Sequence, residues 1–253
     1  MRHTILAAAL AASTLLAAVP ARAETEHVTK TLALDAGGTL RLKSFSGRVT
    51  ITATDRTDVS IDAYRHASRA QLAAIKLDIR AEGSSTIVIE ANQHEHSWLD
   101  FARGSNVVET DFNIQVPRRI NLDVSVFSAP VTTTGIEGTQ NVHTFDSQLK
   151  LEEAAGAVEA HSFSGAIEIG ERTWQGHETL DVHTFSGAIA VRLPASARAN
   201  VAFDSFSGHL NSDLPLMLDS SSRRGVRGHL GSGEGGELKL KTFSGDVRIE
   251  TTR

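Results

Sequence analysis

The 253-residue sequence contains no cysteine and few aromatic residues. Without cysteine it can form no disulfide framework, thiol nucleophile or thiolate metal site. Aromatic residues make up 5% of the chain, and phenylalanine supplies ten of them against two tryptophans and one tyrosine. After the first 23 residues, no apolar run approaches the length of a transmembrane helix. These absences exclude a disulfide-stapled protein, a cysteine enzyme and a helical membrane protein with several spans.

The first 23 residues have the pattern of a secretory signal peptide. Arg2 and His3 form a short basic start, residues 5–19 are an apolar run, and Ala21-Arg22-Ala23 is a small-x-small cleavage site. The run is too short for a comfortable membrane span, and no cysteine follows the cleavage site to accept a lipid. We therefore predict export to the periplasm, the cell surface or the medium, in preference to a buried N-terminal helix.

The charge balance is mildly acidic. The formal net charge is −5, and removal of residues 1–23 takes away two arginines and no acid, which leaves 23 basic against 30 acidic residues. Bulk attraction to nucleic acid or anionic lipid needs the opposite sign. We expect neither as a partner.

A short motif centred on phenylalanine recurs along the chain. Its phenylalanines from Phe127 onward are separated by steps of 18, 18, 22, 21 and 37 residues. A repeat of about 20 residues is typical of stacked repeat architectures. The copies are Lys43–Val49, Ser125–Ala129, His143–Leu149, His161–Ile167, His183–Ile189, Asp204–Leu210 and Lys241–Val247.

Apolar residues alternate with polar ones on both sides of each phenylalanine, as in strands with one buried face. Upstream they lie three and five residues before the ring, and downstream four and six residues after it. The inward face therefore slips by one residue near the motif, which indicates a corner or bulge. We predict that the phenylalanine ring points inward and that the following glycine leaves room for a neighbouring ring.

Two short strands and a corner in about 20 residues predict an all-β fold. The favoured architecture is a β-solenoid, a right-handed β-helix-like stack with rungs roughly 4.8 Å apart. An antiparallel β-sandwich is the alternative, but hairpins would not need the same motif in every unit. The 37-residue step fits two coils with one eroded copy, in which residues 213–236 form a loop.

The chain divides into a signal peptide (1–23), an N-terminal β region (24–117) and the repeat solenoid (118–253). We expect the N-terminal region to cap or start the solenoid, because an open end would expose a sheet edge. The spacing of Ser68 and Gln71 suits a capping box and predicts one short helix through Ile75. The strands expected in this region are Val28–Leu34, Thr39–Ser44, Arg48–Thr54, Val59–Tyr64, Ile75–Ile79, Thr86–Glu90 and Val107–Val116.

The segment Asp111–Pro117, the extended Asn121–Val124 and the serial Phe-Ser-Gly-x-Ile/Val units resemble the DUF4097 family of exported bacterial β-strand-repeat proteins, regarded as candidate adhesins. The resemblance covers about residues 28–253 and implies a β-helix-like fold and a location in the cell envelope, without an established chemistry. Ala129 and Ser147 depart from it by replacing the motif glycine, so their corners are expected to be looser or differently turned.

Candidate metal ligands lie in two places. His94, His96 and Asp100 share one loop, and a column of histidines beside acids is expected on one outer face of the repeats. Imidazole and carboxylate suit Zn²⁺ or Cu²⁺, but a polar loop and a hydrogen-bonded ladder are the preferred interpretations, so we predict no metal and no cofactor. The column comprises His143, His161, His183, Glu159 and Asp181.

No catalytic constellation stands out. The repeated serine lacks a nucleophile elbow and occurs at nearly every corner, where a catalytic residue would occur once. Carboxylate pairs are scattered, the glycine-rich 231–236 lacks the lysine of a phosphate loop, and Arg223, Arg224 and Arg227 fit a solvated loop better than an anion site.

We therefore predict a non-enzymatic, exported envelope protein of the adhesin type. Its repeated corners would bind an envelope polysaccharide or protein through many weak contacts. The alternatives are a β-helix enzyme acting on polysaccharide and a structural module whose ends stack into polymers. The ligand and the oligomeric state are left open.

Overall fold

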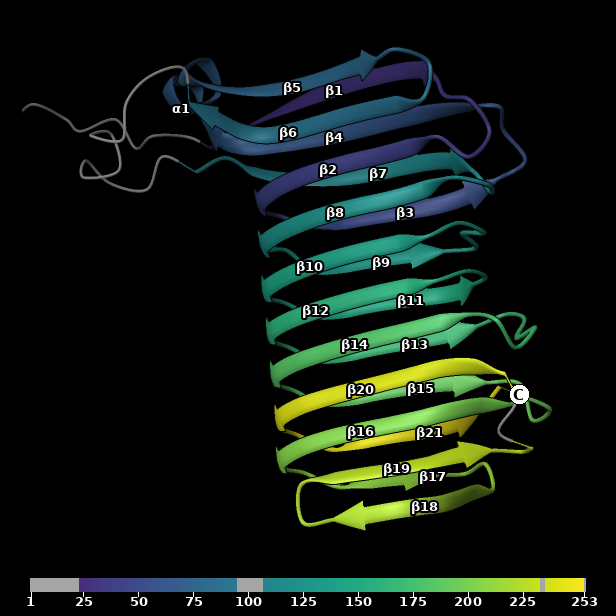
Figure 1. Ribbon diagram of the computed structural model, residues 1–253. Coiled ribbons are helices and arrows are strands. Elements are labelled where there is room, and N and C mark those ends of the chain that lie inside the picture. The colour runs from purple at the N-terminus through teal and green to yellow at the C-terminus, as the bar shows by residue number, and fades with distance from the viewer. Residues whose placement is uncertain (1–22, 95–106, 233–234, 253) are drawn as a thin grey trace, which may run out of the picture.

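The computed structural model describes residues 23–94, 107–232 and 235–252, and these residues form a tall stack of strands in two sheets (Figure 1). One sheet has, in spatial order, β1 (Ala23–Ala33), β4 (Asp58–Ser68), β7 (Glu109–Pro117), β3 (Val49–Thr54), β9 (Val131–Thr134), β11 (Leu149–Ala154), β13 (Ile167–Glu171), β15 (Ile189–Leu193), β21 (Val247–Thr251) and β17 (Leu210–Ser212). The other has β18 (Leu216–Ser222), β19 (Gly225–Leu230), β16 (Ala199–Ser207), β20 (Gly236–Ser244), β14 (Thr179–Ser186), β12 (Val158–Ser164), β10 (Gln140–Asp146), β8 (Asn121–Ser128), β2 (Thr39–Ser46), β6 (Thr86–His94) and β5 (Ile75–Glu82).

Each repeat is one rung, made of a strand from each sheet joined by the phenylalanine motif. Neighbouring rungs pair in parallel and in register, so that His143 faces His161 and His161 faces His183. The predicted β-solenoid is confirmed, and the antiparallel sandwich is wrong for the repeats, because their strands pair in parallel across rungs.

The core is one continuous apolar column between the sheets. In β14 the burial alternates strictly, with Leu180 and Val182 inaccessible to solvent and Asp181 and His183 half-buried. After the corner, Ile189 and Val191 of β15 are again fully buried. The alternation predicted from the sequence is confirmed, and a rung's apolar face is covered mainly by its neighbours.

The phenylalanine of the motif lies outside the core, so the prediction of an inward ring is wrong. The motif rings are 37–57% exposed, from Phe45 to Phe206. Along each upstream strand, the alternation of buried side chains continues up to the residue just before the ring. The shift of this alternation by one residue comes after the ring and not before it. A small side chain fits inside the tight bend, whereas a benzyl ring does not. The buried residues in this position are Ser44, Val126, Thr144, Ser162, Thr184, Ser205 and Thr242.

The motif glycine makes room for backbone and not, as predicted, for a ring. A Cβ on Gly187 would lie 2.1 Å from the carbonyl oxygen of Gly165, and one on Gly245 would lie 2.0 Å from that of Gly187. At Gly187 and Gly245 successive corners therefore approach so closely that a Cβ would clash with the neighbouring backbone. Ala129 and Ser147 occupy the equivalent position at two other corners.

The N-terminal region covers one end of the stack. β1 pairs antiparallel with β4, and β5 pairs antiparallel with β6. Helix α1 (Arg69–Ala74) begins after Ser68, whose side chain forms the predicted capping box with Gln71. The helix prediction is confirmed. No helix in the described ranges is long and apolar enough to cross a membrane.

The prediction that residues 213–236 form a loop in place of a degenerate repeat is wrong. Most of residues 213–236 form an antiparallel hairpin, β18 and β19, which pairs with β16 and covers the other end of the stack (Figure 1). The chain then returns as β20, which lies between β14 and β16. The last repeat along the sequence is therefore the last but one in space.

Residues 1–22 of the predicted signal peptide, as well as His96 and Asp100, lie outside the described residues.

Candidate binding groove

Seven motif phenylalanines form a single stacked column along the corner of the solenoid. Consecutive ring centroids are 4.7–5.0 Å apart and the interplanar angles are 1–12°. The guanidinium carbon of Arg224 lies 4.9 Å from the centre of the last ring and covers that end. The spatial order is Phe45, Phe127, Phe145, Phe163, Phe185, Phe243 and Phe206.

A second column projects from the same strands, two residues before each ring. Between the two columns runs a groove, which we call the aromatic groove, with the residue that precedes each phenylalanine as its floor. One hollow of about 700 Å³ and another of about 500 Å³ share His143 and Thr144, so the groove continues along the stack. The second column consists of Lys43, Ser125, His143, His161, His183, Lys241 and Asp204.

The stacking decides which part of each ring a ligand can touch. Each ring face inside the column is covered by a neighbouring, nearly parallel ring whose centroid lies 4.7–5.0 Å away, so solvent meets mainly the ring edges. Aromatic edges carry the positive part of the ring quadrupole and attract carbonyl or carboxylate oxygens as well as aliphatic groups. The groove wall is thus an apolar ridge about 30 Å long, six steps at the spacing of β-strands.

The structure brings the predicted imidazole and acid columns together. The rings of His161 and His183 stack with centroids 4.8 Å apart, and His143 meets His161 edge-on at 4.9 Å. His183 Nε2 lies 2.8 Å from Asp181 Oδ1, and His161 Nε2 lies 3.5 Å from Glu159 Oε1. Burial, and then the neighbouring imidazoles of His183 and His143, lower the pKa of His161.

A pair of buried carboxyls, which the sequence gave no reason to single out, lies at the opposite corner. Glu171 is inaccessible to solvent, and no described residue hydrogen-bonds to its carboxyl oxygens. Burial, followed by the nearby charge of Glu178, raises the pKa of Glu171 to about 8. Burial opposes ionisation of Glu178 too, but backbone N–H groups of residues 175–177 donate to its carboxylate and hold its pKa below the usual range. Neither residue lines the aromatic groove.

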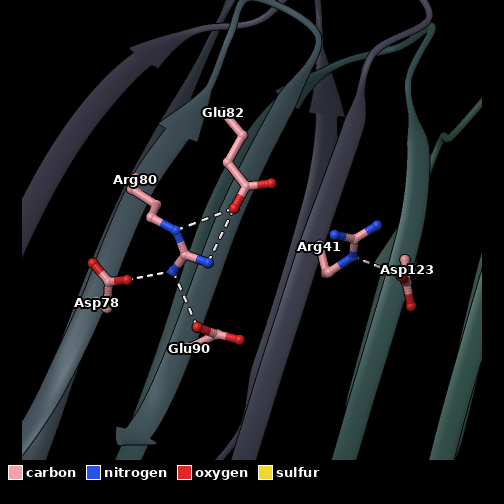
Figure 2. A network of polar contacts seen from close by, with 6 residues as sticks. All are labelled: Arg41, Asp78, Arg80, Glu82, Glu90 and Asp123. Atoms are coloured by element: carbon pink, nitrogen blue, oxygen red, sulfur yellow. Dashed lines mark hydrogen bonds and ion pairs between the residues drawn. The ribbon is translucent and has the colours of Figure 1, made fainter.

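Charged side chains on the outer face near the N-terminal cap form a second network (Figure 2). Arg80 of β5 donates to Asp78 and Glu82 of its own strand and to Glu90 of β6, and these bonds raise its pKa. Nearby, Arg41 of β2 donates to Asp123 of β8 over 3.0 Å. Each arginine links its own strand to a carboxylate of the adjacent strand, which is a structural role at an exposed surface.

The three arginines of the predicted loop do not converge. Arg227 donates to both carboxylate oxygens of Asp204 at 3.1 and 2.9 Å, while Arg224 covers Phe206. Arg223 is exposed in the hairpin turn. In the other predicted metal-ligand cluster, His96 and Asp100 lie outside the described residues.

Comparison with one solved structure agrees with this architecture. The "putative cell adhesion protein" of Clostridium sporogenes, a solved structure, aligns over 90% of this chain and 100% of its own, with 12% identity and a TM-score of 0.50. A "putative adhesin" of Bacteroides fragilis aligns over 90% of this chain and 97% of its own, with 12% identity and a TM-score of 0.41. At these identities the first likeness shows the fold alone. No curated protein matches the sequence significantly.

The family model described as Toastrack DUF4097 matches residues 113–250, which is more than half of the chain and includes the complete aromatic column after Phe45. The chain therefore belongs to the Toastrack DUF4097 family.

Proposed function

We propose that this protein is an exported, non-enzymatic binding protein of the adhesin type, which holds an extended protein segment along the aromatic groove. The observation that carries the proposal is the column of seven half-exposed phenylalanines. Soluble proteins rarely leave a continuous apolar stripe of this length uncovered unless it meets a partner. Export is supported by the pattern of residues 1–23, and the likeness to the "putative cell adhesion protein" of Clostridium sporogenes is consistent with this role.

The chemistry of the groove favours a peptide over a glycan. Sugars bind aromatic side chains through the ring faces, and here each inner face is occupied by the next ring. Ring edges instead suit aliphatic side chains and carbonyl oxygens. The opposite wall offers lysine and imidazole groups that can donate to acidic side chains. An extended acidic and aliphatic segment matches both walls.

Repetition supplies the strength of binding. Each rung presents the same ring edge and, over most of the column, a polar donor, so one rung contributes a weak contact. Contacts made in a single rigid array add without a new association cost for each one. We therefore expect affinity to fall steeply with the number of rings removed.

The proposal is tested with labelled protein and isolated cell envelopes. Phe145→Ser with Phe185→Ser interrupts the stripe at two rungs and should weaken binding by at least about tenfold, if each lost contact is worth about 1 kcal/mol. The matched control is Lys150→Ser with Ala190→Ser, on the outer face of the other sheet in β11 and β15. Equal binding by both variants would contradict the role of the groove.

Two further arms separate the alternatives. Digestion of the envelopes with protease should abolish binding, whereas removal of polysaccharide should not, and the reverse result would replace the peptide by a glycan. Release of sugar fragments from the envelopes by the purified protein alone would overturn the non-enzymatic assignment.

A further inference from the structure

We propose that His161, Asp181 and His183 form a binding site for a late first-row divalent metal ion, with Zn²⁺ as the best match. One imidazole nitrogen from each histidine and one carboxylate oxygen of Asp181 all lie within 4.8 Å of one another. They come from two adjacent strands, β12 and β14, in parallel register. This inference does not depend on the binding of a protein segment to the groove.

The strand register explains why the three groups converge at this rung. Asp181 and His183 are two residues apart, so both project from the same outer face of β14. The register then places His161 directly beside His183 on β12. On the preceding rung, His143 has Asn141 in the place of the acid. Glu159 holds the corresponding place beside His161 at 3.5 Å, whereas Asp181 lies 2.8 Å from His183, so this rung brings the acid nearest to the two stacked imidazoles.

The state of Asp181 is a second, independent observation. Its Oδ1 atom is buried, and although His183 Nε2 lies 2.8 Å away, that oxygen accepts no hydrogen bond from the described residues. The imidazole of His183 is thus the polar group that faces this buried oxygen, and a buried carboxylate oxygen with so few partners is costly. A cation coordinated between Asp181 and the imidazoles would satisfy it.

Coordination requires side-chain rotations that turn a ring nitrogen of His161 and one of His183, whose rings are stacked, toward one point beside Asp181. Bonds of about 2.0–2.2 Å around a tetrahedral Zn²⁺ hold ligand atoms roughly 3.4 Å apart. His161, Asp181 and His183 are each more than one-third exposed at the side chain, so the rotations are unhindered on the solvent side. Two imidazoles and one carboxylate favour zinc, copper or nickel over magnesium or calcium.

The surrounding charges divide between the two sides of the site. Glu159 lies beside His161 and adds negative charge. On the other side, Lys239 and Lys241 of β20 lie next to Asp181 and His183. Lys239 is engaged by Glu237 at 2.7 Å, which reduces its opposition to a cation. With three protein ligands, a bound ion keeps a position open for water or for a ligand oxygen.

Isothermal titration of the metal-free protein with Zn²⁺, without a polyhistidine tag, tests the site. We expect one ion per chain and a raised melting temperature, because an ion that binds only the folded state stabilises it. His161→Ala, Asp181→Asn and His183→Ala should each weaken binding by about tenfold or more. The matched control is His27→Ala, which removes an imidazole 3.2 Å from Asp62 but stacked on Tyr64 and not on a second histidine.

Several results would overturn the site. They are the absence of binding to the parent protein, retention of full affinity in the variant His161→Ala with His183→Ala, and an equal loss in His27→Ala. Circular dichroism of every variant separates loss of a ligand from loss of the fold. In NMR spectra of isotope-labelled protein, Zn²⁺ should shift the backbone amide resonances of β12 and β14. Shifts confined to other strands would also contradict the site.

Discussion

The rungs between β8 and β15 and those after Ala199 carry the same motif but assemble differently. In the first set, spatial order follows chain order, and steps of 18–22 residues join parallel neighbours. In the second, the chain passes through β16 and β17, turns back in the β18–β19 hairpin, and inserts β20 and β21 between rungs already made. The motif thus determines the shape of a rung and not its place in the stack.

The junction between the two regions explains how the inserted rung is held. The connection from β13 to β14 reaches across to the later strands. Trp174 Nε1 donates to the carbonyl oxygen of Arg198 over 2.8 Å. The backbone N–H of Glu237 donates to the carbonyl oxygen of Glu178 over 2.9 Å. The inserted rung is therefore paired on both sides, and the hairpin is left to cover the exposed end.

The largest expected effect comes from ending the chain at Gly231. This removes β20 and β21, whose Leu238, Leu240, Val247 and Ile249 are almost fully buried. Burial of each such side chain contributes about 1.5–3 kcal/mol, so the loss is comparable with the whole stability of a domain. We expect β16–β19 to become protease-sensitive. Urea unfolding measures the stability of the remaining strands, and an unchanged midpoint would show that the inserted rung is dispensable. Deletion of residues 24–33 in the mostly exposed β1 is the control and should cost far less.

Glu171, at the junction, should give the next largest effect and a dependence on pH. The unfolded carboxyl ionises near pH 4.5, whereas burial raises its folded pKa to about 8. Between these values the folded state holds a proton that the unfolded state has lost, so stability falls as pH rises and levels off above about 8. At about 1.4 kcal/mol per pKa unit, Glu171→Leu should add up to a few kcal/mol at neutral pH and flatten this slope. Chemical denaturation at pH 5, 7 and 9 measures it, and an unchanged slope would contradict the assignment.

Gly245→Ala tests the close contact between the inserted rung and its neighbour. A Cβ there would lie 2.0 Å from the carbonyl oxygen of Gly187, so the rungs must move apart at a cost of about 1–3 kcal/mol. Gly170→Ala in β13 is the matched control, because its Cβ would meet nothing nearer than 3.9 Å. Thermal unfolding compares the two. Equal melting temperatures would mean that the corner relaxes without strain.

Arg224→Ala should have the smallest effect. It removes the cation over Phe206 at the end of the aromatic column, a contact worth about 0.5–1 kcal/mol at an exposed site. The loss should be confined to the hairpin end, where amide exchange of β19 measures it, and leave β10 and β12 unchanged. Faster exchange in the central rungs would show that the column transmits the change along its length.

The sequence predicts which residues of the candidate metal site share an outer face, but it does not predict the groove or the burial of Glu171. The positions of His161, Asp181 and His183 on one outer face follow from period-two alternation in aligned repeats. The sequence does not predict the groove, because the alternation of apolar residues shifts by one residue near Phe163. If the shift precedes the ring, the ring points inward; if it follows the ring, as in the structure, the ring points outward. Glu171 carried no local signal, since its burial depends on the connection from β13 to β14 and on the neighbouring rung.

The sequence alone determined the rung: two alternating strands, a corner and a repeat near 20 residues suffice for a solenoid, because periodic burial requires identical neighbours. Only the tertiary structure decided that the rings stack outside the core, since the space inside each bend fits only a small side chain. It also decided the order of the last rungs, because parallel neighbours with matching faces are interchangeable and the pairing of the hairpin and of β20 selects among them. Local pattern specifies what each unit buries, while long-range pairing specifies where each unit lies.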